Sequence, residues 1–402
     1  MPVEKTSRSH SRRSFLQLSA AAALAAAGTR IVTEPILARA LSGPLPEDAV
    51  LIDANENPLG PCAAARDALT SVVSQAGRYP RRMTDNLIDT FAGLEGLKPE
   101  YIRVFPGSSY PLHYAVLAFT SPTKSYVAAE PGYEAGPHAA TISGARIVNI
   151  PLTKTYAHDV RAMLTAAPDA GLFYICSPNN PTGTLTSHSD VEFLLDKKPK
   201  QSILLVDEAY IHFSDGSSVL DLVKADQDVI VLRTFSKIYG MAGLRCGFAI
   251  AKPELLAKIG VFYGWSPMPI TAVAAGIASL KERRLVVERK QINAAVREAI
   301  FEWLDQNRYS YIASQSNCFM FDVKRPAREV ISALAAQNIF VGRPWPVWPT
   351  YVRVTVGTHS EMERFKVAFK RVLAADPAIR LDPSREMSRL SLDGLQIPSI
   401  GS

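Results

Sequence analysis

The sequence predicts an α/β fold: a large domain with a mostly parallel seven-stranded sheet sandwiched by helices, followed by a smaller α+β domain. Two observations support this. Between about residues 100 and 255, short apolar runs rich in β-branched and aromatic residues alternate with helical or polar stretches. Strands of a buried parallel sheet have this continuous apolar character. The chain has 402 residues, of which 47% are hydrophobic, so it is long enough for two packed domains.

The strand candidates of the large domain are short and similar in composition. They are 102–105, 125–128, 146–150, 171–176, 202–206, 229–233 and 246–250. After residue 255 the pattern changes to long helices over 272–305, a strand at 317–323, a helix at 327–337, a Pro- and Trp-rich loop at 343–350, a strand at 351–356 and a closing helix at 360–375. We therefore predict a segment 41–75 packing on the small domain, a large domain over 76–255, a small domain over 256–375 and a partly ordered tail over 376–402.

The positive charge is concentrated at the N-terminus. The formal net charge is +6 and the sequence pI is about 9.0, values that invite a nucleic-acid or anionic-membrane interpretation. Residues 1–40 hold six basic and two acidic side chains, a net of +4, which leaves +2 for the rest of the chain. The predicted domains therefore give no reason to expect nucleic acid as a partner.

Residues 1–40 have the pattern of an export signal. Ser11-Arg12-Arg13-Ser14-Phe15-Leu16 precedes an apolar run from Leu18 to Ala27, and Ala38-Arg39-Ala40 fits a cleavage site. The paired arginines resemble a bacterial twin-arginine signal, which implies export of the folded protein to the periplasm or beyond. The alternative is a basic tail before an Ala-rich first helix. The run is shorter than the roughly 20 residues that span a bilayer, so no stable membrane span is expected.

Cysteine and histidine spacing predicts no metal site. Cys62, Cys176, Cys246 and Cys318 are scattered without a CxxC pair, and the seven histidines form no HExxH-like pattern. An oxidising compartment would permit a disulfide, but the spacing does not identify one.

Ligands of an open α/β sheet bind beyond the carboxyl ends of its strands, so the residues after each strand are informative. Strand 102–105 is followed by Gly107, Ser108 and Ser109 at a helix start, where backbone N–H groups and the helix dipole favour a phosphate. An ordinary N-cap serine is the alternative. Strand 171–176 leads into 177–183, a turn with two prolines that holds Asn180 in one place.

Two further strand ends lead to charged residues, and a third charged residue follows them. Strand 202–206 ends at Asp207, strand 229–233 leads to Lys237, and Arg245 follows that lysine by eight residues. A buried lysine can lose its proton and form a Schiff base. A carboxylate can pair with a pyridine nitrogen, while hydroxyls and an arginine hold a phosphate. Together these groups suit pyridoxal 5′-phosphate (PLP).

Seven motifs follow one another along the chain. They are Asn-Glu-Asn-Pro-Leu-Gly-Pro (55–61), Arg-Tyr-Pro (78–80), Pro-Gly-Tyr (131–133), Pro-Asn-Asn-Pro-Thr-Gly (178–183), Asp-Glu-Ala-Tyr (207–210), Thr-Phe-Ser-Lys (234–237) and Gly-Leu-Arg-Cys-Gly-Phe (243–248). In this order they resemble the fold-type-I PLP-dependent aminotransferases of class I/II, most closely the histidinol-phosphate aminotransferase group. The resemblance covers about residues 50 to 375. It implies transfer of an amino group between an amino acid or related amine and a 2-oxo acid.

The resemblance also implies roles for residues of the PLP site. Lys237 matches the lysine that binds the cofactor covalently and later moves a proton, and Asp207 matches the partner of the pyridinium nitrogen. Asn180 and Tyr210 match the partners of the ring 3′-oxygen, and Tyr133 matches the aromatic residue stacked on the ring. The residues that match the phosphate cup are Gly107, Ser108, Ser109, Thr234, Ser236 and Arg245.

The remaining implied roles concern the substrate and a second subunit. Arg353 matches the arginine that binds the anionic group of the substrate, and Asn55 lies in the segment that folds over the substrate. Tyr79 resembles a residue that reaches the cofactor phosphate of the neighbouring subunit, which implies a homodimer.

The chain departs from the family pattern at three points. Tyr110 follows Ser109 where an acid is common, and Gly342 precedes Arg343 where a second substrate arginine is expected directly after the strand. Either Arg343 takes that part displaced by one residue, or the pocket is rebuilt around Trp345 and Trp348, whose alternative role is loop packing. The export signal is the third departure. Together they argue against histidinol phosphate itself as the substrate.

The same scaffold also suits a PLP-dependent lyase or decarboxylase, because the reaction depends on which Cα bond stands perpendicular to the cofactor ring. A PLP-sensing regulator would need a DNA-binding segment, for which the signal-like N-terminus leaves no room.

Overall fold

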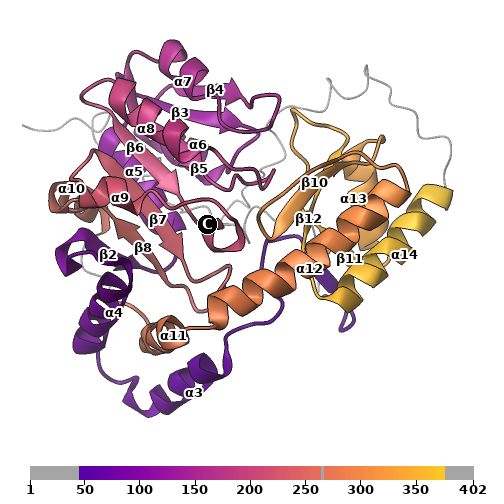
Figure 1. Ribbon diagram of the computed structural model, residues 1–402, viewed down its shortest axis with the longest axis horizontal. Coiled ribbons are helices and arrows are strands. Elements are labelled where there is room, and N and C mark those ends of the chain that lie inside the picture. Colours follow the sequence, from indigo (N-terminus) through magenta and orange to yellow (C-terminus); the bar gives the residue numbers. More distant parts are fainter. Residues whose placement is uncertain (1–44, 264–266, 376–402) are drawn as a thin grey trace, which may run out of the picture.

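The computed structural model describes residues 45–263 and 267–375, which form two domains joined by one long helix (Figure 1). The predicted export signal over 1–40 and the tail over 376–402 lie outside the described residues. Each domain has its own apolar core.

The large domain is built on a seven-stranded sheet, as predicted. Its strand order is β2-β8-β7-β6-β5-β3-β4. Strand β8 is antiparallel to both neighbours, and the other pairs are parallel. The strands are β2 (Ile102–Phe105), β3 (Ser125–Glu130), β4 (Ile147–Pro151), β5 (Ala170–Cys176), β6 (Ile203–Asp207), β7 (Val229–Thr234) and β8 (Gly247–Ile250). Every residue of β5, β6, β7 and β8 is buried, which explains their continuous apolar sequences.

Helices flank this sheet on both faces (Figure 1). They are α3 (Ala63–Ser71), α4 (Arg81–Glu95), α5 (Ser109–Phe119), α6 (Ala135–Ser143), α7 (Val160–Ala166), α8 (His188–Lys197), α9 (Leu220–Lys224), α10 (Pro253–Tyr263) and α11 (Ile270–Lys281). Two of these helices have a side-chain N-cap. Asp159 caps α7 by accepting from the Ala162 amide, and Ser187 caps α8 by accepting from the Asp190 amide.

The small domain contains two short sheets. Strand β1 (Val50–Ile52) pairs in parallel with β11 (Ile339–Val341). Strand β10 (Cys318–Asp322) lies between β9 (Tyr311–Ile312) and β12 (Tyr351–Thr355), antiparallel to both. The helices are α12 (Leu285–Gln306), α13 (Ala327–Ala335) and α14 (His359–Ala375).

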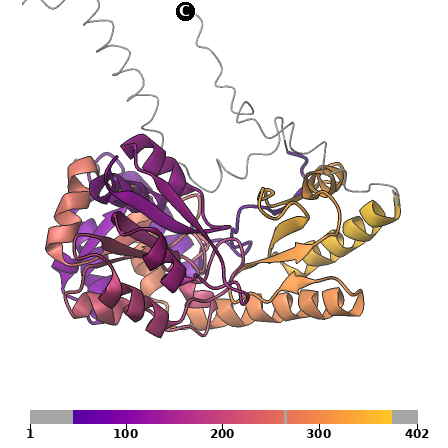
Figure 2. The ribbon, with the colours of Figure 1, turned by 90° about the horizontal axis from the view of Figure 1, so that it is seen from above.

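The two cores divide the chain differently from the predicted boundaries at 75/76 and 255/256. Helix α11 packs against α3 and α4, and its residues Ala272 and Val273 belong to the core of the large domain. Helix α12 joins the domains (Figures 1 and 2). Its residue Leu285 contributes to the large core and Ile300 to the small one. Composition could not show this division, because one continuous helix serves both cores.

The segment over 41–75 is also divided. Strand β1 places Val50 and Ile52 in the small core, whereas Ala65 of α3 packs in the large core. The chain therefore crosses between the domains over residues 53–62, directly beside the carboxyl ends of the strands of the large sheet (Figure 1).

All four cysteines lie within the described residues, and each is a free thiol. Over 45–263 and 267–375, no helix combines the length and the apolar character that crossing a bilayer requires.

Candidate active site

The carboxyl ends of adjacent strands bring the predicted site residues together. Cys176 at the end of β5 pairs in register with Asp207 at the end of β6. Strand β7 ends at Thr234, and the turn after it carries Lys237. The edge strand β2 leads into Gly107 and the start of α5. The ends of four strands thus meet at one edge of the sheet.

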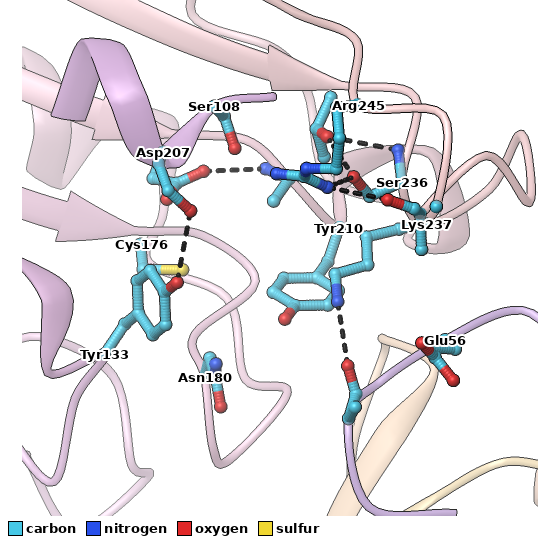
Figure 3. Close-up of a pocket in the computed structure, with 16 residues that line it drawn as sticks. Glu56, Ser108, Tyr133, Cys176, Asn180, Asp207, Tyr210, Ser236, Lys237 and Arg245 are labelled. Carbon is cyan, nitrogen blue, oxygen red and sulfur yellow. Dashed lines mark hydrogen bonds between the residues drawn. The ribbon is translucent and has the colours of Figure 1, made fainter. Parts of the chain in front are cut away.

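These residues line a cavity of about 260 Å³ (Figure 3). Its lining includes most of the predicted cofactor site, namely Ser108, Ser109, Tyr133, Asn180, Asp207, Tyr210, Thr234, Ser236, Lys237 and Arg245. Ala54, Glu56, Cys176, Ala209, Ala242 and Gly243 complete it.

One end of the cavity is suited to an anion. Arg245 donates from Nη1 to Ser236 Oγ (3.2 Å) and to the Ala242 carbonyl (2.8 Å), and Thr234 Oγ1 donates to Ser236 Oγ (3.0 Å). These acceptors are neutral, and burial lowers the pKa of the Arg245 guanidinium. An anion beside it would stabilise the charged form. Ser108 and Ser109 stand at the start of α5, whose dipole also favours an anion.

Two glycines allow this close packing. A Cβ at Gly107, where φ is +89°, would overlap Nη2 of Arg245 and lie 2.9 Å from its Cζ. A Cβ at Gly247 would lie 2.8 Å from the Ser108 amide nitrogen. The loop after β2 therefore lies directly against Arg245 and β8 only because neither residue carries a side chain.

Another part of the cavity holds the buried carboxylate of Asp207. Its Oδ2 accepts from the Tyr174 hydroxyl (3.0 Å) and its Oδ1 from the Ala209 amide (3.1 Å). Burial raises the pKa of Asp207 to about 6, while the Tyr174 hydrogen bond and the nearby Lys237 ammonium act in the opposite direction. A cation placed against this carboxylate would hold it in the ionised form.

Lys237 lies within the cavity and is 8% exposed. Its Nζ donates to the Ala54 carbonyl (3.1 Å) and lies 5.6 Å from the centre of the Tyr210 ring (Figure 3). The amine is thus held inside the cavity by a hydrogen bond and shielded from water.

Arg353 and Asn55 lie behind the cavity rather than on its lining. Arg353 is fully buried on β12 and donates to Asn180 Oδ1 (2.9 Å) and to the Asp53 carbonyl. Asn55 is also fully buried: its amide donates to the Tyr210 hydroxyl (3.0 Å), and Thr355 Oγ1 donates to its side-chain oxygen (3.2 Å). Both residues thus connect the small domain to side chains that line the cavity.

Arg343 forms a side-chain ion pair across the domains. Its Nε donates to Glu134 Oε1 (2.8 Å) and its Nη2 donates to Glu134 Oε2. Trp345 packs beside it and is 3% exposed, whereas Trp348 is half-buried and contacts Tyr156 and Tyr351.

Of the predicted cofactor residues, Gly107, which packs against Arg245, and Tyr79 are not on the cavity lining. Tyr79 precedes α4 and is 67% exposed in the single chain. Sequence reasoning missed Glu56, Tyr174 and Glu134. The acid at 56 stands inside the recognised 55–61 motif, which was a signal for it; the contacts of Tyr174 and Glu134 depend on tertiary packing.

His188, Glu192 and Asp221 are the described residues that form a group with metal-ligand spacing, although the sequence indicated no such site. Their side chains are half-buried or exposed, and His188 Nε2 is 3.0 Å from Asp221 Oδ1. This hydrogen bond raises the pKa of His188, so the group is explained as a surface ion pair.

The cavity has a basic end at Arg245, a buried carboxylate at Asp207 and an amine at Lys237. PLP carries a phosphate monoester, a pyridine nitrogen and an aldehyde, and these three groups match Arg245, Asp207 and Lys237. The fold and the site are therefore those of a PLP-dependent enzyme.

Comparison with known proteins identifies the family. Residues 47–369 match the family of class I and II aminotransferases, and the chain belongs to it. A histidinol-phosphate aminotransferase of Symbiobacterium thermophilum is 33% identical over 332 residues, which cover 81% of this chain and 91% of that protein. An aromatic amino acid aminotransferase of Nocardia farcinica is also 33% identical and covers 82% of this chain and 92% of its own. The protein is a PLP-dependent aminotransferase.

Solved structures agree on the fold. The histidinol-phosphate aminotransferase from Sinorhizobium meliloti in complex with pyridoxal-5′-phosphate has a TM-score of 0.76 at 23% identity, covering 86% of this chain and 96% of its own. An L-threonine-O-3-phosphate decarboxylase from Porphyromonas gingivalis has a TM-score of 0.68 at 18% identity, covering 80% and 99%. At these identities the likeness concerns the fold alone, which serves more than one reaction.

Proposed function

We propose that the enzyme transfers the amino group of an amino acid or related amine, bound through its anionic group by Arg353, to a 2-oxo acid. The observation that carries this proposal is the chain of contacts from Arg353 through Asn180 to the cavity that contains Lys237. An anion at Arg353 would place the amino-bearing carbon on the Asn180 side of the cavity. The relatives' names include an aromatic amino acid and histidinol phosphate as donors, and the three departures from the family pattern argue against the latter.

When bound, PLP supplies an aldehyde that takes up the amino group and a ring that withdraws electrons from the reacting carbon. Lys237 Nζ would accept the proton from that carbon and return it to the carbon that came from the PLP aldehyde, because it is the amine that lines the cavity and is shielded from water. Asp207 holds the pyridine nitrogen in its protonated form, and Tyr174 orients Asp207. Arg245, Ser236 and Thr234 bind the phosphate, and Tyr133 and Tyr210 confine the ring.

The test of this function is a half-reaction. The PLP-loaded enzyme is mixed with a panel of amino acids and amines, while absorbance follows conversion to the pyridoxamine form and chromatography detects the keto acid. Conversion with formation of a keto acid supports transamination. Release of ammonia or CO₂ without conversion would instead indicate a lyase or a decarboxylase.

We propose further that the active enzyme is a homodimer in which Tyr79 of one subunit completes the site of the other. The exposure of Tyr79 in a single chain, in a motif that otherwise matches the family, supports this. Lys237→Ala and Tyr79→Ala chains, each weak or inactive alone, should regain activity when mixed, because one site of a mixed dimer carries neither change. No gain on mixing, with subunit exchange shown by native mass spectrometry, would contradict the shared site.

We also propose that residues 1–40 direct twin-arginine export to the periplasm. The pattern of Arg12 and Arg13 before Phe15 and an apolar run supports this proposal. Fusion of 1–45 to a reporter should export it, and exchange of both arginines for lysine should leave the reporter in the cytoplasm. Equal export by both fusions would overturn the proposal.

A further inference from the structure

The ion pair between Glu134 and Arg343 joins the two domains beside the active site. Arg343 follows β11 in the small domain, and Glu134 directly precedes α6 in the large one. Two hydrogen bonds bind both carboxylate oxygens of Glu134 to the guanidinium. The Arg343 side chain is only 10% exposed, so solvent screens this pair less than a surface pair.

Trp345 ties this pair to the cavity. The guanidinium carbon of Arg343 lies 4.6 Å from the Trp345 ring centre, and that of Arg353 lies 5.3 Å from it. The indole N–H donates to the Gly132 carbonyl (3.3 Å), next to Tyr133 on the cavity wall. Arg343 and Arg353 therefore both pack against the buried Trp345, on the same side of the cavity.

The two arginines have different roles in the proposed function. Arg353 donates to the Asn180 side chain and to the Asp53 carbonyl, and it is the residue that binds the anionic group of the substrate. Arg343 faces a carboxylate, and its positive charge is already compensated. Glu56, which lines the cavity, adds a further negative charge. A donor with two anionic groups would have to displace Glu134 or leave one of its own charges uncompensated.

We propose that Glu134 is a specificity-determining residue that neutralises Arg343 and so restricts the enzyme to amino donors with one anionic group and an uncharged side chain. This rests on the proposed function, in which Arg353 binds that one anion. Donors with a second anionic group, whether a carboxylate or a phosphate, are disfavoured because Arg343 is engaged with Glu134.

The test compares two donors in one enzyme. The ratio of kcat/KM for glutamate to kcat/KM for phenylalanine is measured in the PLP-loaded wild type and in Glu134→Gln. The variant keeps the size of the side chain and removes its charge, which frees Arg343 for a second carboxylate. We expect the ratio to rise about tenfold or more, the usual effect of one charge-assisted hydrogen bond. An unchanged ratio would overturn the proposal.

Two further variants keep the test decisive. Glu134→Asp retains the negative charge, so its ratio should stay close to that of the wild type. In Glu134→Gln combined with Arg343→Gln the rise should disappear, because the arginine that it depends on is gone. A rise of equal size in this double variant would mean that Glu134 acts by another route, and the proposal would fail.

A binding measurement gives a readout that does not depend on turnover. Calorimetric titration with succinate and with 3-phenylpropionate, both unreactive, should show that Glu134→Gln gains affinity for the dicarboxylate relative to the monocarboxylate. No relative gain in a variant whose melting temperature shows a folded protein would count against the role of Glu134. If no amino donor converts the wild type, the proposed function fails; if donors convert it but neither ratio moves, only this inference fails.

Discussion

Substitution of Gly107 by alanine tests the phosphate-binding end of the cavity. At φ +89° an L residue is strained, at a cost of roughly 1–2 kcal/mol, and the added Cβ overlaps Nη2 of Arg245. The strain exists with and without PLP, so it lowers the free energy of unfolding. Displacement of Arg245, in contrast, removes a charge-assisted contact worth about 1.5–3 kcal/mol to a bound phosphate. PLP affinity should therefore fall about 10- to 100-fold.

The assay titrates the cofactor-free protein with PLP and follows absorbance or quenching of tryptophan fluorescence. Gly60→Ala is the matched control, because Gly60 has φ +63° and a Cβ there would have no atom within 4 Å. The control should lose stability by a similar amount while its PLP affinity stays near the wild-type value. An affinity of Gly107→Ala within threefold of the wild type would refute the placement of the phosphate beside Arg245.

Three other predictions concern neighbouring groups. Burial raises the pKa of Asp207 to about 6, so between about pH 4 and pH 6 the folded cofactor-free chain binds more protons than the unfolded chain and its stability falls as pH rises. Urea unfolding should show this in the free energy of unfolding of Asp207→Asn minus that of the wild type, which should rise by up to about 3 kcal/mol from pH 4 to pH 7. A difference that does not change with pH would contradict the burial argument. Tyr174→Phe removes a donor that lowers the pKa of Asp207, so PLP should bind more weakly, by about tenfold, in the same titration; unchanged affinity would exclude a positioning role for Tyr174. Arg353→Gln should raise KM for amino donors at least tenfold in steady-state assays, and an unchanged KM would place the substrate anion elsewhere.

The large sheet and the cofactor side of the site were predictable because they depend on local sequence. Fully buried strands such as β5 and β6 are continuous apolar runs, and a polar residue at the end of such a run marks the ligand-binding edge. Asp207 was identified on this basis, and the cavity contains it beside Lys237. The motif resemblance then implied a role for each residue.

The contacts that the sequence could not supply join distant parts of the chain. Glu134 and Arg343 are 209 positions apart, and nothing near either residue indicates the other. The sequence pattern marks Tyr174 only as a buried strand residue, yet its hydroxyl donates to Asp207 on the neighbouring strand. The division between the two cores depends on packing in the same way: α12 is continuous, and only packing shows that Leu285 and Ile300 belong to different cores.

The central claim is that Lys237 is the residue that binds PLP covalently. Reduction of the PLP-loaded enzyme with borohydride followed by peptide mass spectrometry locates the pyridoxyl group directly. The account predicts one labelled lysine, Lys237, and loss of both the label and the visible absorbance in Lys237→Ala. A label on another lysine, or an unchanged spectrum in the variant, would contradict it.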